Sequence, residues 1–260
     1  MQIELILNPL NIDPMKLLYH VGRYYMLIGK IFSKPEKIKM YYHKTLDEIN
    51  NLGINSMWIV VIISVFVGAV ITIQTDYNIE NPLLPRYLIG VAVRDMLFLE
   101  FSSTMVALIL AGKVGSSISS ELGTMRITEQ IDALEIMGIN SASYLILPKI
   151  IAAIFFFPFL AILSAAVGMI GGYLVALTTD ITNPQEYVYG LQYVFYPFYF
   201  TYSLKKMVVF AFIITSVSAY HGYYAEGSSL EVGRASTKAV VHSSIIILMF
   251  NLILTKLILQ

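Results

Sequence analysis

The residues of this chain that could do catalytic chemistry are its histidines and a Gly-Lys segment, and neither set has the spacing that catalysis needs. The four histidines form no HExxH pattern or other spacing typical of metal ligands: His20, His43, His221 and His242. The segment AGKVGSS, residues 111–117, lacks the spacing of a phosphate-binding P-loop. No G-x-S-x-G elbow occurs, and the absence of cysteine excludes thiolate metal sites and cysteine nucleophiles. We therefore predict no catalytic residue, no cofactor and no metal in this chain.

A different chemistry, charge recognition, is concentrated in the stretch 119–138, SSELGTMRITEQIDALEIMG. It carries four carboxylates and one base: Glu121, Glu129, Asp132, Glu135 and Arg126. Its apolar residues gather loosely on one side at helical spacing, which predicts a short amphipathic helix. Because an anionic membrane surface repels carboxylates, we expect such a helix to dock into a basic groove on a partner protein. The alternative is a solvated helix in a loop, without a partner.

The third candidate is a set of polar side chains within apolar segments. Glu100 lies in or at the edge of such a segment, and a charge at the centre of a bilayer costs about 2.5–3.5 kcal/mol on insertion scales. Such a residue normally faces a cavity or a partner; the alternative is a glutamate in contact with water at the interface. Lys205 and Lys206 could pair with Glu100 or a lipid phosphate, or simply extend to the interface. Asn251 could hydrogen-bond across helices, which favours packing over ligand binding.

These residues must be positioned by an all-α bundle of membrane-spanning helices. The chain has 260 residues and is 57% hydrophobic and 13% charged, about half the charge of a typical soluble domain. Five apolar segments are long enough to cross about 30 Å of hydrocarbon: 56–75, 96–118, 144–177, 206–224 and 239–258. The third exceeds one perpendicular crossing, so we expect it to tilt or to kink at Pro148 or Pro158. Its Gly168, Gly171 and Gly172 would let a neighbouring helix approach closely.

Residues 1–52 differ from the rest because they hold seven of the chain's 17 bases: Lys16, Arg23, Lys30, Lys34, Lys37, Lys39 and Lys44. Apolar residues recur between these bases at helical spacing, which predicts an amphipathic helix in the membrane interface; the alternative is an ordinary cytoplasmic helical cap. Since basic residues favour the cytoplasmic side, the N-terminus and the stretch 119–138 are predicted to face the cytoplasm, which holds ATP. A net charge of zero gives no general attraction to nucleic acid.

Several long motifs in order resemble the MlaE/YrbE permease family, the membrane subunits of ABC transporters for phospholipids or related lipids. They are ELGTMRITEQIDALEIMG, AGKVGSSISSELGTMR, LPKIIAAIFFFPFL with GMIGGYL, and EGSSLEVGRASTKAVVHSSIIIL, and together they cover about residues 55–257. The resemblance implies one permease domain over 1–260, with N-terminal helices in 1–52 and the five-span bundle in 53–260. It further implies a multi-pass protein of the bacterial inner membrane with a cytoplasmic N-terminus.

The resemblance also assigns partners and site residues. The acidic helix would be the coupling helix, which docks on a separate cytoplasmic ATPase that binds ATP and Mg²⁺, through these residues: Glu121, Met125, Arg126, Glu129, Gln130, Asp132, Leu134 and Glu135. A lipid site is expected at Glu100, Lys205, Lys206 and Asn251. Two copies would form a homodimer around a lipid cavity and exchange phospholipid with a periplasmic protein that carries the lipid-binding domain of mammalian-cell-entry (MCE) proteins.

The chain departs from the family pattern at a few positions. The common arginine before the glutamate of span two is Leu99, the Gly-Pro after it is Ser102-Ser103, and the arginine of the AGR motif is Lys113. An aspartate often found in the last span is Asn251. The first of these departures concern local lipid contacts, and none falls in the docking helix.

Three other classes of function are compatible with parts of this pattern. A membrane-embedded enzyme would need a nucleophile or an acid–base set within the spans, and would form product as a purified chain. An ion-driven secondary lipid transporter often shows inverted repeats and several intramembrane ionisable groups, whereas Glu100 is the one clear candidate here. Its lipid movement would persist without ATP and collapse with the ion gradient. A passive scaffold is the third class, and no sequence feature excludes it.

Overall fold

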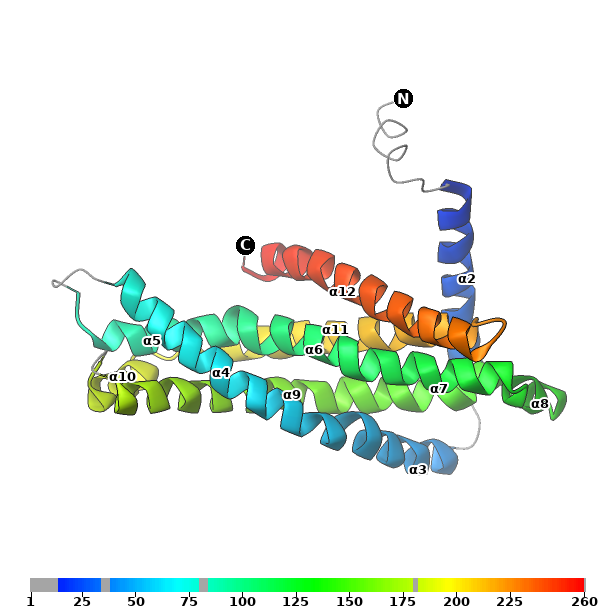
Figure 1. The fold of residues 1–260 in the computed structure, drawn as a ribbon, viewed down its shortest axis with the longest axis horizontal. Coiled ribbons are helices and arrows are strands. Elements are labelled where there is room, and N and C mark those ends of the chain that lie inside the picture. Colours follow the sequence, from blue (N-terminus) through cyan, green and yellow to red (C-terminus); the bar gives the residue numbers. More distant parts are fainter. Residues whose placement is uncertain (1–13, 34–37, 80–83, 180–181, 260) are drawn as a thin grey trace.

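The computed structural model describes residues 14–33, 38–79, 84–179 and 182–259, and within these ranges it contains helices and no strand (Figure 1). Five helical stretches are long and apolar enough to cross a membrane, as predicted: Lys39–Asn78, Tyr87–Ile127, Ser141–Thr178, Pro197–Tyr223 and Ser229–Ile258. Helices suit this setting because every backbone polar group is satisfied within the segment. The chain is therefore an all-α, multi-pass membrane protein.

The first two spans are longer than their apolar cores. The first comprises α3 (Ile38–Glu48), a π-helical turn (Ile49–Ile54) and α4 (Asn55–Asn78). The second comprises α5 (Tyr87–Met96), η3 (Leu97–Met105), α6 (Val106–Leu110), η4 (Ala111–Gly115) and α7 (Ser116–Ile127), with η3 and η4 π-helical. The prediction of 96–118 for span two was too short, because the helix runs from Tyr87 to Ile127 and includes the charged Arg94 and Asp95 at one end and the polar residues after Ile118 at the other.

The third span, α9 (Ser141–Thr178), runs through Pro148 and Pro158 as one helix and packs along α4. A Cβ added at Gly68 of α4 would overlap the carbonyl group of Gly168 on α9, so the two backbones touch. One turn earlier on each helix, the hydroxyls of Ser64 and Ser164 lie 2.8 Å apart. The close approach expected of the α9 glycines is thus confirmed, and it joins spans one and three without intervening side chains.

Spans four and five, α11 (Pro197–Tyr223) and α12 (Ser229–Leu259), complete the bundle. The helix α11 is largely buried between α9, α7 and α12, whereas α12 keeps many apolar side chains exposed. Both helices begin earlier than predicted, since Pro197 occupies a favourable first-turn position and only four residues, 225–228, separate α11 and its cap from α12. These early starts change where the lysines of span four lie.

The N-terminal helix α2 (Pro14–Phe32) projects away from the bundle at the end that carries α7 and α8 (Figure 1). It buries Leu27 and Ile31 in the main core and exposes Tyr25 and Met26 on its other side. The predicted amphipathic helix is therefore present, and its position in the membrane interface stays a prediction. Residues 1–13 and the predicted basic residues Lys34 and Lys37 lie outside the described part of the chain.

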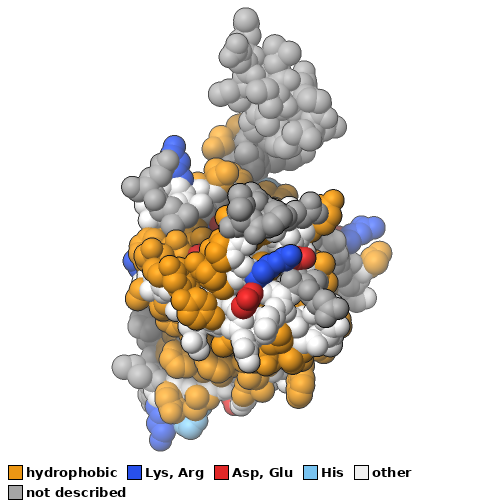
Figure 2. Space-filling view, turned by 90° about the vertical axis from the view of Figure 1, so that its left-hand side faces the viewer, with side chains coloured by type: hydrophobic (Ala, Val, Ile, Leu, Met, Phe, Trp, Pro, Cys, Tyr) orange, Lys and Arg blue, Asp and Glu red, His pale blue; other side chains and the backbone are white. Residues whose placement is uncertain are grey.

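The opposite end of the bundle is closed by the short helix α10 (Pro184–Gln192) against α5. Arg94 of α5 is buried there, and its guanidinium donates to the carbonyls of Leu191 (3.0 Å), Tyr193 (2.7 Å) and Val194 (3.2 Å). These bonds hold the segment after α10, in which Val194 has a φ of 39°. Figure 2 looks onto this end, where apolar side chains surround a small group of charged ones.

Candidate functional site

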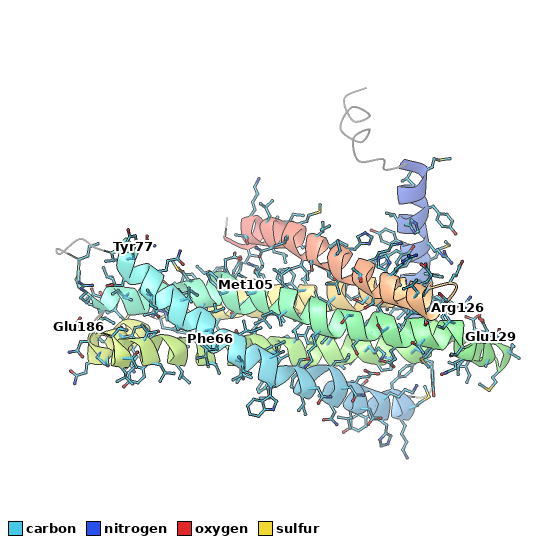
Figure 3. All side chains as sticks on the ribbon, in the orientation of Figure 1. Phe66, Tyr77, Met105, Arg126, Glu129 and Glu186 are labelled. Atoms are coloured by element: carbon cyan, nitrogen blue, oxygen red, sulfur yellow. The ribbon has the colours of Figure 1, made fainter. Side chains whose placement is uncertain are left out.

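The acidic stretch 119–138 forms a corner at the far end of span two (Figure 3). A short amphipathic helix was predicted within this stretch, and the structure contains one, separated from the spanning helix by a break. The helix α7 ends at Ile127, and α8 (Gln130–Ile136) follows after two residues. The break lies at Glu129, whose φ of 59° is left-handed and cannot continue a right-handed helix. The acidic segment is thus the end of a spanning helix plus a separate helix of two turns.

Several of the predicted coupling residues hold this corner to the rest of the chain. The Glu121 carboxylate accepts a bond of 2.8 Å from Lys149 of α9, which also pairs with Glu48 at 2.6 Å. Arg126 and Asp132 form an ion pair that closes the turn between α7 and α8. Met125 and Leu134 are partly buried against the main core. These five side chains of the stretch therefore position α8.

Among the carboxylates of the stretch 119–138, Glu135 accepts the most hydrogen bonds. Its Oε1 accepts from Lys30 Nζ of α2 (2.7 Å), Ser141 Oγ of α9 (2.8 Å) and Tyr223 OH of α11 (2.9 Å). The bond from Lys30, followed by the bond from Ser141, lowers the pKa of Glu135 to about 2. Burial is the largest single effect and lowers the pKa of Lys30, but the interactions with Glu135 and Tyr223 together outweigh it and the net pKa is raised. Both groups are therefore charged at neutral pH.

Ile131 of α8 is buried in the main core, whereas several other side chains of α8 and its turn are exposed. Glu129 and Gln130 are exposed, and Gln130 donates to the Thr128 hydroxyl at 3.1 Å. Beyond them, Ile136 is 88% exposed and Met137 is 65% exposed at the tip of α8. Sequence reasoning placed Met137 on the apolar side and overlooked Ile136. The sequence feature that could have identified this exposed tip is the pair of apolar residues just before Gly138. In the structure Gly138 has a φ of 78°, which ends the helix.

A second polar cluster lies inside the bundle and contains three of the four predicted lipid-site residues. The Glu100 carboxylate accepts from Lys206 Nζ of α11 and from Asn251 Nδ2 of α12, both at 3.0 Å. Lys206 is fully buried, whereas the Glu100 side chain is 41% exposed. Lys205, the next residue on α11, is exposed and points away from this cluster. Lys206 was predicted at the start of its span, but it lies in the third turn because α11 begins at Pro197.

Three further residues complete this cluster and were not predicted. Thr104 donates to Glu100 at 3.1 Å, and the Tyr202 hydroxyl lies 3.0 Å from Lys206 Nζ and 2.8 Å from Thr255 Oγ1. Each of the three lies four residues from a predicted one, on the same helix face: Thr104 from Glu100, Tyr202 from Lys206, and Thr255 from Asn251. The helical repeat could have identified them, although it could not tell that the three faces meet.

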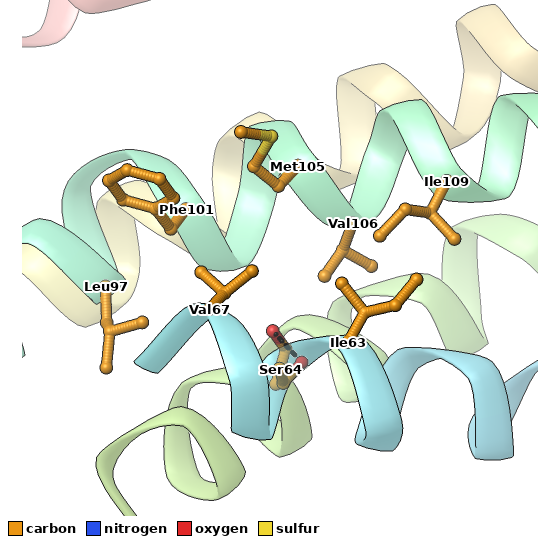
Figure 4. A pocket seen from close by; sticks show the side chains of 9 residues that line it. Ile63, Ser64, Val67, Leu97, Phe101, Met105, Val106 and Ile109 are labelled. Carbon is orange, nitrogen blue, oxygen red and sulfur yellow. Dashed lines mark hydrogen bonds between the residues drawn. The ribbon is translucent and has the colours of Figure 1, made fainter. Parts of the chain in front are cut away.

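The described residues enclose little space close to this cluster. A groove of about 10 Å³ between α4, span two and α9 holds about one water molecule, and its lining is almost entirely apolar (Figure 4): Ile63, Ser64, Val67, Leu97, Phe101, Met105, Val106, Ile109 and Ser164. An open hollow of about 460 Å³ lies on α12 beside Leu252, Ile253, Lys256 and Leu257. The groove is far too small for an acyl chain, and the hollow is a surface feature of one helix.

The histidines form one pair and no metal group. His221 Nε2 and His242 Nδ1 are 2.8 Å apart, which is a hydrogen bond between α11 and α12. Among the residues that the structure describes, no group of three or more His, Asp or Glu side chains is arranged to hold a metal ion. The pair therefore acts in helix packing.

Comparison with known proteins gives a consistent set of matches. The family model described as "Permease MlaE" matches residues 45–257. A probable ABC transporter permease protein of Rickettsia bellii is 33% identical over 252 residues, with 97% of each chain covered. The intermembrane phospholipid transport system permease protein MlaE of Haemophilus influenzae is 29% identical over 237 residues, covering 89% of this chain and 88% of that protein. A probable ABC transporter permease protein of Synechocystis is 32% identical over 241 residues, covering 91% and 89%.

Proposed function

The chain belongs to the MlaE permease family, and from that premise we propose that it is the membrane subunit through which a separate ATPase drives phospholipid transport. The transfer would run between the inner membrane and a periplasmic partner with an MCE domain. The name of the Haemophilus relative supports phospholipid as the substrate class. This chain would supply the path and the mechanical connection, while ATP and Mg²⁺ would be bound by the partner ATPase.

The observation that carries this proposal is the exposed apolar tip on an internally braced helix. Ile136 and Met137 are exposed at the end of α8, although about one turn earlier the corner is fixed by the pair of Asp132 with Arg126. A large apolar side chain that is 88% exposed outside the apolar belt of a membrane protein is expected to be covered by a partner. The exposed Glu129 beside it would supply charge complementarity to a basic rim.

In the proposed arrangement, the end of the bundle that carries α8 binds the ATPase, and the space between two copies holds the lipid. The α8 end and the N-terminal helix α2 would face the cytoplasm, because the bases before span one favour that side. An ATPase docked on α8 of each of two copies would draw the two copies together when it binds ATP. The lipid cavity would lie between the copies, a proposal supported by the small size of the groove within one chain. Closure would narrow that cavity and expel lipid.

The polar cluster at Glu100 would lie beside the lipid path. Lys206 Nζ already contacts Glu100, Tyr202 and the carbonyl of Leu99, so the ammonium has its hydrogen-bonding capacity filled within the chain. Glu100 keeps an exposed edge, and we propose that this edge faces the lipid headgroup, with Lys206 and Asn251 holding the carboxylate in place. Lys205 would then contact the lipid phosphate region from outside the cluster.

The docking proposal can be tested by changing the exposed tip. Ile136→Asp removes an apolar contact without touching an internal bond, so the tagged chain, co-expressed with its ATPase, should lose the ATPase on purification from membranes. The matched control is Leu84→Asp, an exposed apolar residue near the opposite end of the bundle, which should retain it. Both variants should elute as the parent does in detergent. Undiminished retention of the ATPase by Ile136→Asp would contradict the docking surface proposed here.

A further inference from the structure

The end of α2 is fastened to the start of α9 and to α8 by two separate sets of hydrogen bonds. In the first, Lys30 Nζ donates to Glu135 Oε1 at 2.7 Å, and the same oxygen accepts from Ser141 and Tyr223. In the second, the Asn140 amide donates to the carbonyls of Lys30 (2.8 Å) and Ser33 (2.7 Å). The two sets lie on either side of the turn between α8 and α9.

Asn140 satisfies two helix ends at once. Its Nδ2 donates to carbonyl groups at the C-terminus of α2, where helix carbonyls lack the usual partner from the next turn. Its Oδ1 accepts from the backbone N–H of Ser143 at 3.3 Å, so Asn140 is also the N-cap of α9. The turn itself is tight, because Gly138 N–H bonds to the Glu135 carbonyl and Ile139 N–H to the Leu134 carbonyl. The α8–α9 turn is therefore too short and too well hydrogen-bonded to act as a flexible linker, so a displacement of α8 also moves the start of α9.

The remainder of α2 also contacts α11 and the residue after it. Tyr24 OH lies 2.8 Å from Ser216 Oγ and His20 Nδ1 lies 2.7 Å from Tyr220 OH, both on α11, and the Arg23 guanidinium stacks 3.8 Å from the ring centre of Tyr224, the C-cap of α11. The outer side of the helix is apolar and uncovered by the chain, with Tyr25 69% and Met26 67% exposed. The helix α2 is thus attached to the bundle along one side and, at its C-terminus, to the turn that carries the docking tip.

We propose that Glu135 and Asn140 are positioning residues that make α2 follow α8 when the ATPase moves it. This inference rests on the proposed docking function and extends it to the membrane surface: the ATPase would shift the depth of α2 as well as the width of the lipid cavity. Charge-assisted bonds of this geometry are short and directional, so they transmit displacement in both directions. Coupling requires contacts between α2 and the α8–α9 turn that depend on the position of α8. These contacts are the bond from Lys30 to Glu135 and the bonds from Asn140 to the end of α2.

The test uses the absence of cysteine in the chain. Met26→Cys on the exposed side of α2 is labelled with a nitroxide before the ATPase is added, and the complex is assembled in lipid nanodiscs. Accessibility of the label to oxygen and to a nickel chelate reports its depth, with and without ATP plus vanadate. The same label at Glu129→Cys, used after the labelled variant is shown to retain the ATPase, reports the movement of the α8 corner. In the parent background we expect both labels to change their accessibility on ATP trapping.

In the double variant Glu135→Gln/Asn140→Ala the change at Glu129 should remain and the change at Met26 should disappear. Lipid moved per ATP hydrolysed should fall at least about fivefold, the lower end of coupling between distinct sites. Glu135→Asp with Asn140 intact should restore most of both readouts. Asp76→Asn, which removes an exposed ion pair with Arg86 far from α8, should change neither.

The inference is overturned if the Met26 label responds to ATP in the double variant as it does in the parent. It is equally overturned if, in the parent, the α8 label responds and the α2 label does not, a comparison that needs no destabilising variant. Failure of the proposed function has a different signature, because the parent chain would then not retain the ATPase at all.

Discussion

Two glutamate–lysine pairs in this chain have similar geometry and opposite surroundings. Lys30 and Glu135 are 2.7 Å apart at the end of the bundle, with side chains 44% and 41% exposed. Lys206 and Glu100 are 3.0 Å apart within the spanning helices, and the lysine is fully buried. Each glutamate also accepts bonds from hydroxyl or amide groups on other helices: Ser141 and Tyr223 for Glu135, and Asn251 and Thr255 for Glu100. The difference between the pairs is therefore the access of water to the lysine.

Access to water determines what each pair can do. An exposed pair gains little net free energy because water and salt screen it, so the Lys30–Glu135 pair adds little stability by itself and connects α2 to α8 together with the bonds from Asn140 to the end of α2. A buried ammonium differs, because breaking its pair leaves an unpaired charge in a medium of low dielectric constant. The Glu135 pair is suited to transmit movement, whereas the Glu100 pair is suited to fix α11 and α12 against span two.

The largest effect is expected from removing the partner of the buried lysine. Glu100→Leu leaves Lys206 charged and unpaired within the bundle, and losses of this kind cost about 3–5 kcal/mol. Thermal unfolding in detergent micelles should show a marked decrease in midpoint. The double variant Glu100→Leu/Lys206→Met removes both charges and should recover most of the stability. If Glu100→Leu unfolds at the same temperature as the parent, the buried Glu100–Lys206 pair is no more costly to break than the exposed Lys30–Glu135 pair, and the comparison made here fails.

A smaller effect is expected at the amide that braces the buried pair. Asn251→Leu removes the bonds to Glu100 Oε2 and to Thr104, each 3.0 Å long. Hydrogen bonds between membrane helices contribute about 0.6–1.7 kcal/mol, so the same unfolding assay should show a modest decrease. Leu252→Ala, at the neighbouring exposed position on α12, is the control and should change stability less. Equal effects of the two changes would show that Asn251 does not brace Glu100.

The smallest effect is expected at the exposed pair, where it should depend on pH. Glu135→Gln should cost about 0.2–1 kcal/mol at neutral pH, as typical exposed pairs do. Because the folded-state pKa of Glu135 is lowered from 4.5 to about 2, its contribution is complete above pH 4.5 and is lost as the pH falls towards 2.

The stability difference between the parent and Glu135→Gln should therefore vanish over that acidic range when urea unfolding is followed at a series of pH values. Glu186→Gln, on the exposed surface of α10 at the other end, provides the matched comparison. A difference that stays constant down to pH 2 would contradict the assigned role of the Lys30 contact.

The five spans could be predicted because a bilayer imposes one simple requirement, about 20 apolar residues in a row, and the chain meets it five times. The contact through Gly168 was also predictable, since glycines in a spanning helix mark close approach. Both features depend on composition over a window and need no knowledge of which helices are neighbours.

Features that depend on single backbone angles or on neighbours were mostly not predictable. The left-handed Glu129 divides the acidic stretch, and nothing in its residue type requires that conformation. Glu135 was grouped with the docking carboxylates, although its partner Lys30 lies 105 residues away in the sequence. The pairing of Lys206 with Glu100 was one of the alternatives stated from the sequence and is confirmed, whereas the contact of Asn251 with Glu100, 151 residues away, depends on helix packing that one sequence does not reveal.

The backbone contact between α4 and α9 limits how the molecule can deform. Where Gly68 meets Gly168 there is no side chain whose rotamer could change, so sliding or rotating one helix on the other would force main-chain atoms into each other. Spans one and three must then travel as a single rigid plate. A change in the shape of the bundle then has to arise between other pairs of helices.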